Sequence, residues 1–271
     1  MSEDGGEEEG KTWPDLADQA YQDSLKPAVQ ELGKSLETLT KAVNAALSPV
    51  GALVWGYEQC QDFINQKVAE KLSRTDERNI TTPAPNVAGP VLEALRYSGY
   101  QEDLQDLFAN LLANAMDAEE MRNAHPAFVE VLKSMTSDEA KIMKIFGENL
   151  NRFYPVIDLK LIDNNEKGFK YLYRNLSTAG DRAGCECPDL TPSYLNNLQR
   201  MGLMEINSGE VNRKEVYKNI EKKSLVEELF NYYENSEDYD VEIDRKSVIL
   251  SEFGKQFALA CVIEKGSEVE V

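Results

Sequence analysis

The sequence has few of the residues that form most catalytic and metal-binding sites. Its 271 residues include one histidine, His125, and four cysteines, of which only Cys185 and Cys187 lie close together. Two thiolates do not complete a four-ligand zinc site, and a single histidine needs partner side chains to act as a base or as a ligand. We therefore expect no metal, no cofactor and no catalytic residues, and we assign His125 a structural role.

Motifs and long apolar runs that would define a class of protein are also absent. The sequence contains no P-loop, no Gly-x-Gly-x-x-Gly and no Gly-x-Ser-x-Gly, so enzymes built on those motifs are not indicated. No apolar run reaches the roughly 18 to 20 residues of a membrane-spanning helix. Because no secretory signal precedes the cysteines, we expect reduced thiols and a location in the cytoplasm or on the cytoplasmic face of the inner membrane.

Basic residues are scarce relative to acidic ones. The 48 aspartates and glutamates outnumber the 29 lysines and arginines, which gives a formal net charge of -19. A surface of this charge repels nucleic acid and anionic lipid at long range, although a small basic patch can persist on it. Residues 1–12 are acidic and glycine-rich, and we expect them to form a disordered tail.

The first half of the chain has strong helical periodicity. An apolar stripe at steps of three and four predicts a buried helix over residues 104–116, and Pro90 and Pro126 predict the starts of the helices on either side. Ser73–Pro85 has the composition of an extended linker. The leucine stripe of Trp13–Lys41 cannot bury itself alone, which predicts a homo-oligomer. We assign residues 13–135 to a helical, oligomerising region.

One stretch of this region, Ala42–Tyr57, is a candidate membrane-active segment. From Ala42 to Trp55 only Asn44 and Ser48 are polar, and the segment ends on aromatic residues that suit a membrane interface. The alternative interpretation is that the segment is simply part of the core. The residues that we expect to act on the membrane are Leu47, Val50, Leu53, Val54, Trp55 and Tyr57.

After Met135 the pattern becomes mixed. Thr136 and Glu139 have capping-box spacing and predict the start of a helix. Further elements follow from alternation, periodicity and turn residues. They are strands at 156–162, 169–176, 203–206 and 241–250, and helices at 192–201, 224–235 and after Ser251. Their order resembles a winged helix with a sheet of three strands or fewer, so we predict an α+β protein, mostly α, with residues 136–271 forming a winged-helix-like regulatory domain.

Polar and basic side chains gather in this second region. In a winged helix they would form an anion-binding patch for a nucleic-acid or nucleotide ligand. The alternative is a winged helix that contacts a protein, which the net charge favours. The candidate ligand-binding residues are Asn197, Arg200, Arg213, Lys214 and Lys218.

Several short motifs taken together resemble the Abi-alpha family of bacterial abortive-infection proteins. They are PVGALVWGY at 49–57, PAPNVAGP at 83–90, LEALRY at 92–97, LFANLL at 107–112 and HPAFV at 125–129. The resemblance implies defence against phage by damage to, or arrest of, the host cell. It supplies no catalytic residues.

Three hypotheses follow. The first is a non-enzymatic effector, or toxin, whose N-terminal helices assemble and perturb the inner membrane, as an ion channel would, under the control of a ligand or of a partner encoded by a neighbouring gene. The second is a soluble sensor or adaptor that binds a protein or nucleic acid through its C-terminal domain. The third is an enzyme whose site has no recognisable motif.

Overall fold

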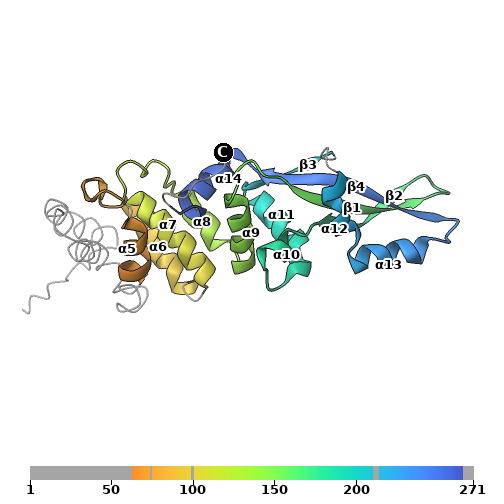
Figure 1. Cartoon of the computed structure of the whole chain (residues 1–271), viewed down its shortest axis with the longest axis horizontal. Helices are drawn as coiled ribbons and strands as arrows, with labels where there is room; N and C mark the ends of the chain where they lie inside the picture. The colour runs from red at the N-terminus through yellow and green to blue at the C-terminus, as the bar shows by residue number, and fades with distance from the viewer. Residues whose placement is uncertain (1–62, 74, 99–100, 210–213, 265–271) are drawn as a thin grey trace, which may run out of the picture. The chain divides into compact units, whose positions relative to one another are not determined.

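The computed structural model describes residues 63–73, 75–98, 101–209 and 214–264, which fall into two compact units (Figure 1). Unit 1 comprises residues up to 100 together with 108–130, and unit 2 comprises 101–107 together with 131 onward. The fold class is α+β, as predicted, whereas a winged-helix form of unit 2 is not confirmed. The predicted acidic tail, the Trp13–Lys41 helix and the Ala42–Tyr57 segment lie outside the described residues.

Helices and helical turns supply most of the first part of the described chain. The predicted helix over 104–116 is confirmed as α7, and its apolar stripe is buried. The elements here are η2 (Phe63–Val68), α5 (Ala69–Leu72), η3 (Glu77–Asn79), α6 (Pro85–Ser98), α7 (Glu102–Ala115) and α8 (Ala127–Lys133). α7 begins in unit 2 and ends in unit 1, so one continuous helix belongs to both.

The predicted start of α6 is wrong. The helix begins at Pro85 and carries Pro90 within it. Both prolines lack an N–H that would need a partner, but Pro85 comes first and its fixed φ already suits the first helical position. Pro90 therefore lies inside the helix, which has one backbone hydrogen bond fewer at that position.

The predicted linker before α6 is extended only in part, because hydrogen bonds fasten it inside unit 1. The Thr81 N–H donates to the Met116 carbonyl at 2.7 Å, and the Ala118 N–H donates to the Asn79 carbonyl at 2.8 Å. These bonds flank an isolated β-bridge between Ile80 and Asp117. The segment between α5 and α6 is thus held against the C-terminal end of α7.

The capping box predicted at Thr136 is confirmed at the start of α9 (Ser137–Gly147). The Thr136 hydroxyl accepts from the Glu139 N–H at 3.2 Å, and the Glu139 carboxylate accepts from the Thr136 N–H at 2.7 Å. Two donors that a helix start leaves without partners are thereby satisfied. Downstream of α9 the chain enters the sheet.

The sheet is antiparallel and has four strands in the order β2-β1-β4-β3, which corrects the expectation of three strands or fewer. The predicted hairpin is β1 (Tyr154–Asp163) with β2 (Phe169–Leu176), and the predicted later strands are β3 (Met204–Ser208) and β4 (Tyr239–Leu250). β4 is 12 residues long and pairs with β1 along one edge and with β3 along the other. β4 is therefore the strand that joins the β1–β2 hairpin and β3 into one sheet.

Short helices cover the sheet and complete the core of unit 2. Ile157 and Leu159 of β1 pack with Tyr217, Ile220 and Val226, which come from the helices on one face. The remaining elements are α10 (Ala179–Ala183), η4 (Pro188–Leu190), α11 (Thr191–Arg200), η5 (Lys214–Tyr217), α12 (Lys218–Glu221), α13 (Ser224–Tyr233), α14 (Glu252–Phe257) and η6 (Ala258–Val262). The helices predicted near 192–201, 224–235 and after Ser251 are confirmed.

An ion pair is buried within the sheet. Asp158 alternates with the core residues along β1, and its carboxylate lies 2.7 Å from the Lys246 ammonium of β4. Asn175 joins this pair, because its N–H donates to Asp158 at 2.8 Å and its side-chain oxygen accepts from Lys246 at 2.7 Å. Asn175 has a φ of 58°, a left-handed conformation that asparagine tolerates better than most residues. The network therefore fixes where β2 departs from regular pairing.

Candidate functional site

A hollow in the described part of unit 2 lies where the connection from α9 to β1 meets α10 and α12. Its volume is about 560 Å³, which falls within the usual range for small-molecule sites. Its lining comes from three separate stretches: residues 149–155, Thr178 with Arg182, and Val216 with Asn219. We call it the arginine hollow.

A tight turn after α9 shapes one wall of the arginine hollow. The Asn149 side-chain oxygen accepts from the Asn151 N–H at 3.0 Å, and the Asn149 carbonyl accepts from the Arg152 N–H at 3.1 Å. Asparagine favours such turns because its side chain can bond to backbone two residues on. The turn ends at Tyr154, whose buried ring lies 4.5 Å from the Phe146 ring and whose hydroxyl donates to the Ile145 carbonyl.

The opposite wall of the hollow is held against β1 by hydrogen bonds. The Ser177 hydroxyl donates to the Pro155 carbonyl at 2.9 Å, and its oxygen accepts from the Ala179 N–H at 3.2 Å. This places the first residues of α10 beside β1. Arg182, in the last turn of α10, has its guanidinium carbon 5.6 Å from the centre of the Tyr154 ring.

The lining of the arginine hollow is cationic although the chain is acidic. Among the described residues that line it are Arg152 and Arg182, three asparagines and a threonine, and none of these described residues is an aspartate or glutamate. Arg152 also pairs with Glu148 at 3.2 Å, and Glu148 is not part of the lining. Within the described residues, no ion pair is formed by Arg182. Guanidinium groups bind carboxylates and phosphates through paired hydrogen bonds, and amides bind the edges of planar polar groups. The arrangement is therefore suited to a small anion that also carries hydrogen-bonding groups.

The residues predicted to bind a ligand, as far as the structure describes them, do not line the arginine hollow. Asn197, on α11, donates to the Glu139 carboxylate at 2.8 Å, and Arg200 donates twice to the Asn197 side-chain oxygen. These two are brought together by contacts inside unit 2. Lys218 is exposed on α12, next to Asn219 of the hollow. Arg213, the Lys214 side chain and the six predicted membrane residues lie outside what the structure describes.

Sequence reasoning missed Arg152 and Arg182 because they belong to separate elements with no motif between them. One signal was present in the run Arg152-Phe153-Tyr154-Pro155, which places a cation beside two rings at the start of a strand. The residues that complete the hollow come from α10 and α12, and only the fold brings them there.

Cys185 and Cys187 belong to a loop that is held by one carboxylate. Asp138 accepts hydrogen bonds from the backbone N–H groups of Glu186 and Cys187 and from the Tyr194 hydroxyl, at 2.9, 3.0 and 3.0 Å. Burial, and then the charge of Asp138, raise the pKa of the Cys185 thiol to about 11, so this thiol is protonated at neutral pH. Across the described residues there is no group of three or more His, Cys, Asp or Glu side chains that could hold a metal ion.

His125 lies at the start of α8, where its Nδ1 accepts from the Ala127 N–H at 3.1 Å. Its ring is 5.9 Å from that of Phe128. The histidine thus caps the helix start, in agreement with the structural role assigned to it. Of the helices described, none is both long and apolar enough to cross a lipid bilayer.

Known proteins resemble the chain to different degrees. No curated protein matches the sequence. A solved structure of an uncharacterized protein from the hydrocarbon-degrading marine bacterium Alcanivorax borkumensis SK2 is 24% identical and covers 48% of this chain and 89% of its own. Its TM-score is 0.35, and a likeness of this size carries no argument about fold or function. The family model described as abortive infection alpha matches residues 56–261, well over half of the sequence. The resemblance of the short motifs is thereby confirmed, and the chain belongs to the Abi-alpha family of abortive-infection proteins.

Proposed function

We propose that this chain is a non-enzymatic abortive-infection effector against phage, whose activity is controlled by a small anionic ligand in the arginine hollow. Membership of the family supports the role in phage defence. The observation that carries the proposal of ligand control is the lining itself, whose described residues include two arginines and no carboxylate in a chain of net charge -19. A lining of this kind concentrates anions at one place on a surface that otherwise repels them.

A series of contacts within unit 2 leads from the arginine hollow to α7. Arg152 lies in the turn that follows α9, and α10, which carries Arg182, packs on α9. Ser137 in the first turn of α9 and Lys144 in its last turn both bond to Asp103 at 2.7 Å. Asp103 lies in the first turn of α7, the helix that belongs to both units. A ligand that holds Arg152 and Arg182 together restrains α9, and through Asp103 it restrains α7.

In this proposal the effector segment is Ala42–Tyr57. Its run of apolar residues is too short to span a bilayer alone, so several copies held in an oligomer act on the inner membrane together. The ligand keeps the assembly inactive, and its loss or replacement during infection releases the segment. A ligand shifts such an equilibrium only by the difference in its affinity for the two states.

The second candidate function is a soluble sensor or adaptor. The same hollow favours it, since ligand binding in unit 2 needs no membrane step. The two candidates differ in the role of Ala42–Tyr57, which is exposed on release in the first and permanently buried in the second.

Ligand binding is tested by calorimetric titration of the full-length protein with pyrophosphate and with adenosine monophosphate. We expect one of these anions to bind and Arg182→Ser to weaken its binding at least about tenfold, because a charge-assisted bond is lost. Arg122→Ser is the matched control, as Arg122 is another exposed arginine, in unit 1, and should leave binding unchanged. Equal binding by wild type and Arg182→Ser, or no binding of either anion, would overturn the proposal of ligand control.

A further inference from the structure

Aromatic side chains gather at the C-terminal end of α13, and none of them lines the arginine hollow. Val226 is buried and Leu225 and Leu229 are half-buried against the sheet, so one side of the helix is used for packing. Toward the C-terminal end of the helix Tyr232 is 79% exposed and Phe230 is 38% exposed, and nearby Tyr239 is 38% exposed. The rings of Tyr232 and Tyr233 lie 4.9 Å apart, and those of Tyr233 and Tyr239 lie 6.3 Å apart. We call this set, Phe230, Tyr232, Tyr233 and Tyr239, the α13 aromatic surface.

The fold of the described chain does not account for this surface. No hydrogen bond joins the hydroxyls of Tyr232, Tyr233 or Tyr239 to another described residue. An exposed ring gains little from burial within its own chain, and tyrosine is enriched where proteins bind one another. Exposed aromatic clusters of this kind mark interaction sites.

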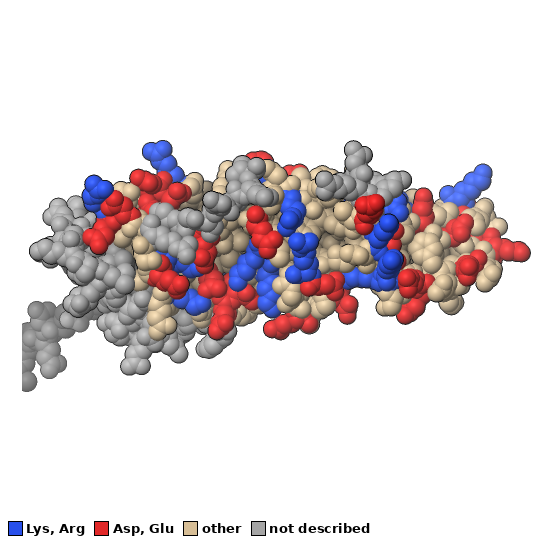
Figure 2. All heavy atoms as spheres, viewed as in Figure 1, with Lys and Arg blue, Asp and Glu red and all other residues tan. Residues whose placement is uncertain are grey.

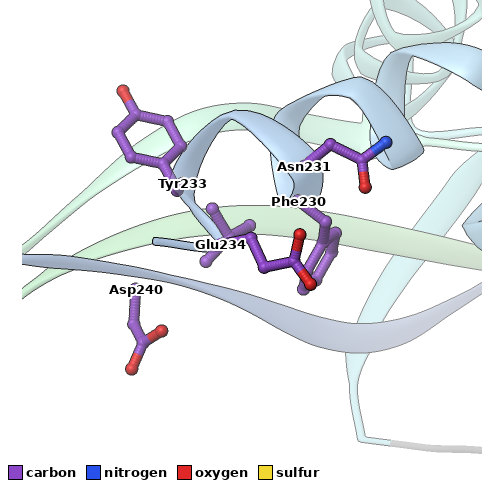
Figure 3. A pocket seen from close by; sticks show the side chains of 6 residues that line it. Phe230, Asn231, Tyr233, Glu234 and Asp240 are labelled. Carbon is purple, nitrogen blue, oxygen red and sulfur yellow. The ribbon is translucent and has the colours of Figure 1, made fainter. Parts of the chain in front are cut away.

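A hollow of about 300 Å³ opens between the aromatic surface and β4 (Figure 3). Phe230, Tyr233 and Glu234 line it from α13, and Asp240 and Val241 line it from β4. Figure 3 shows Phe230 and Glu234 reaching from the helix toward β4, with the Asn231 amide turned the other way. The hollow therefore presents a ring and a carboxylate to the same space.

The segment that carries the aromatic surface has charged side chains of one sign only. Residues 224–242 contain seven carboxylates and no lysine or arginine. None of the seven forms an ion pair with a basic side chain elsewhere in the described residues. On the face seen in Figure 2, acidic and uncharged atoms cover most of the end of unit 2 where Figure 1 places the β1–β2 turn and the C-terminal end of α13.

We propose that the α13 aromatic surface docks a basic, arginine-bearing segment of another protein. A guanidinium stacks on an aromatic ring and pairs with a carboxylate, and here rings and carboxylates occupy one surface. Nucleic acid and anionic lipid are repelled by the same carboxylates. A second copy of this chain brings a net charge of -19 to an already acidic surface, which disfavours self-association there.

The test is fluorescence anisotropy of a short labelled peptide of alternating arginine and glycine, titrated with the full-length protein at low salt. The variant Tyr232→Ser with Glu234→Gln should weaken binding at least about fivefold, because it removes a ring and a charge together. Raising the salt concentration should weaken binding by the wild type. A peptide of alternating glutamate and glycine should not bind.

The matched control is Tyr97→Ser with Glu93→Gln on α6, which removes the same two groups from another exposed site. Thermal unfolding of both variants verifies that they fold. Failure of the wild type to bind the basic peptide at low salt would overturn the proposal. Equal weakening by the two double variants would overturn it as well, since binding would then follow net charge and not this surface.

Discussion

The buried ion pair between Asp158 and Lys246 strongly constrains the fold of unit 2. Both side chains are more than nine-tenths buried, and Asn175 satisfies a further bond on each. Arg174 also approaches the Asp158 carboxylate, at 3.9 Å, but its side chain is 62% exposed. A buried charge without its partner is far less stable than an exposed one.

Substitution of one member of the pair should destabilise the fold strongly. Lys246→Met leaves the Asp158 carboxylate buried without its closest cation, and we expect a loss of about 3–5 kcal/mol in the free energy of unfolding. Lys255→Met is the control, because Lys255 pairs with Glu252, whose side chain is 86% exposed. The control should lose no more than about 1 kcal/mol. Urea unfolding measures both, and similar losses would contradict the assigned role of the pair.

Asp138 should make stability depend on acid pH. Burial alone raises the pKa of its carboxyl, but hydrogen bonds from Glu186, Cys187, Tyr194 and Lys141 outweigh burial and lower the pKa below the ordinary 3.8. A lowered folded-state pKa means that the carboxylate stabilises the fold above about pH 4 and that this contribution is lost as the pH falls through the folded-state value.

Asp138→Asn should therefore reduce the loss of unfolding free energy between pH 5 and pH 3, as well as reducing stability at neutral pH. Asp189→Asn is the control, because Asp189 is exposed and its side chain makes no hydrogen bond within the described residues. Denaturant unfolding at several pH values measures the slopes. A slope unchanged by Asp138→Asn would show that other carboxyl groups cause the acid sensitivity.

At the scale of elements, two glycines in helices have opposite surroundings. A Cβ at Gly254, in α14, would collide with the Leu203 carbonyl oxygen, whereas a Cβ at Gly89, in α6, would meet no atom within 4 Å. Gly254→Ala should destabilise by about 1–3 kcal/mol through overpacking. Gly89→Ala should stabilise by about 0.5–1 kcal/mol, since alanine loses less conformational freedom in a helix. Thermal unfolding measures the stability of both variants. Changes of the same sign in the two melting temperatures would be inconsistent with the close approach of α14 to Leu203.

Most elements could be predicted because each depends on neighbouring residues. The apolar stripe of α7, the capping box of α9 and the Ser251 cap of α14 are local signals, and the structure has all three. The number of strands in the sheet could not be predicted in the same way. It depends on pairing between β1 and β4, which lie far apart in the sequence, and nothing local specifies that contact.

The arginine hollow was beyond prediction for the same reason. In the sequence Arg152 and Arg182 look like ordinary surface residues. Only in the fold, where the Ser177 hydrogen bonds hold α10 against β1, do they line one hollow. The prediction of a ligand-binding patch on α11 did not include the hydrogen bonds that join Asn197 to Arg200 and to Glu139. Polar side chains on a helix face can equally well be partners of a neighbouring element.

At the scale of the whole molecule, the proposed function has a ligand in unit 2 that controls a segment in the N-terminal part of the chain. The proposed link is α7, which carries Asp103 in its first turn within unit 2 and has its later residues in unit 1. Two variants separate the parts of this account. Under the proposed function Arg182→Ser should remove ligand control, and Leu53→Asp with Trp55→Asp should place charges in the proposed effector segment, which are strongly unfavourable in a membrane.

The most direct measurement follows phage titre and membrane potential together in bacteria that express the full chain and are infected with phage. We predict that wild-type cells depolarise before lysis and release few phage. Cells with Leu53→Asp and Trp55→Asp should keep their potential and release normal numbers, while Arg182→Ser should depolarise cells without infection. The account would be contradicted if wild-type cells restrict phage while their membrane potential stays at the level of uninfected cells.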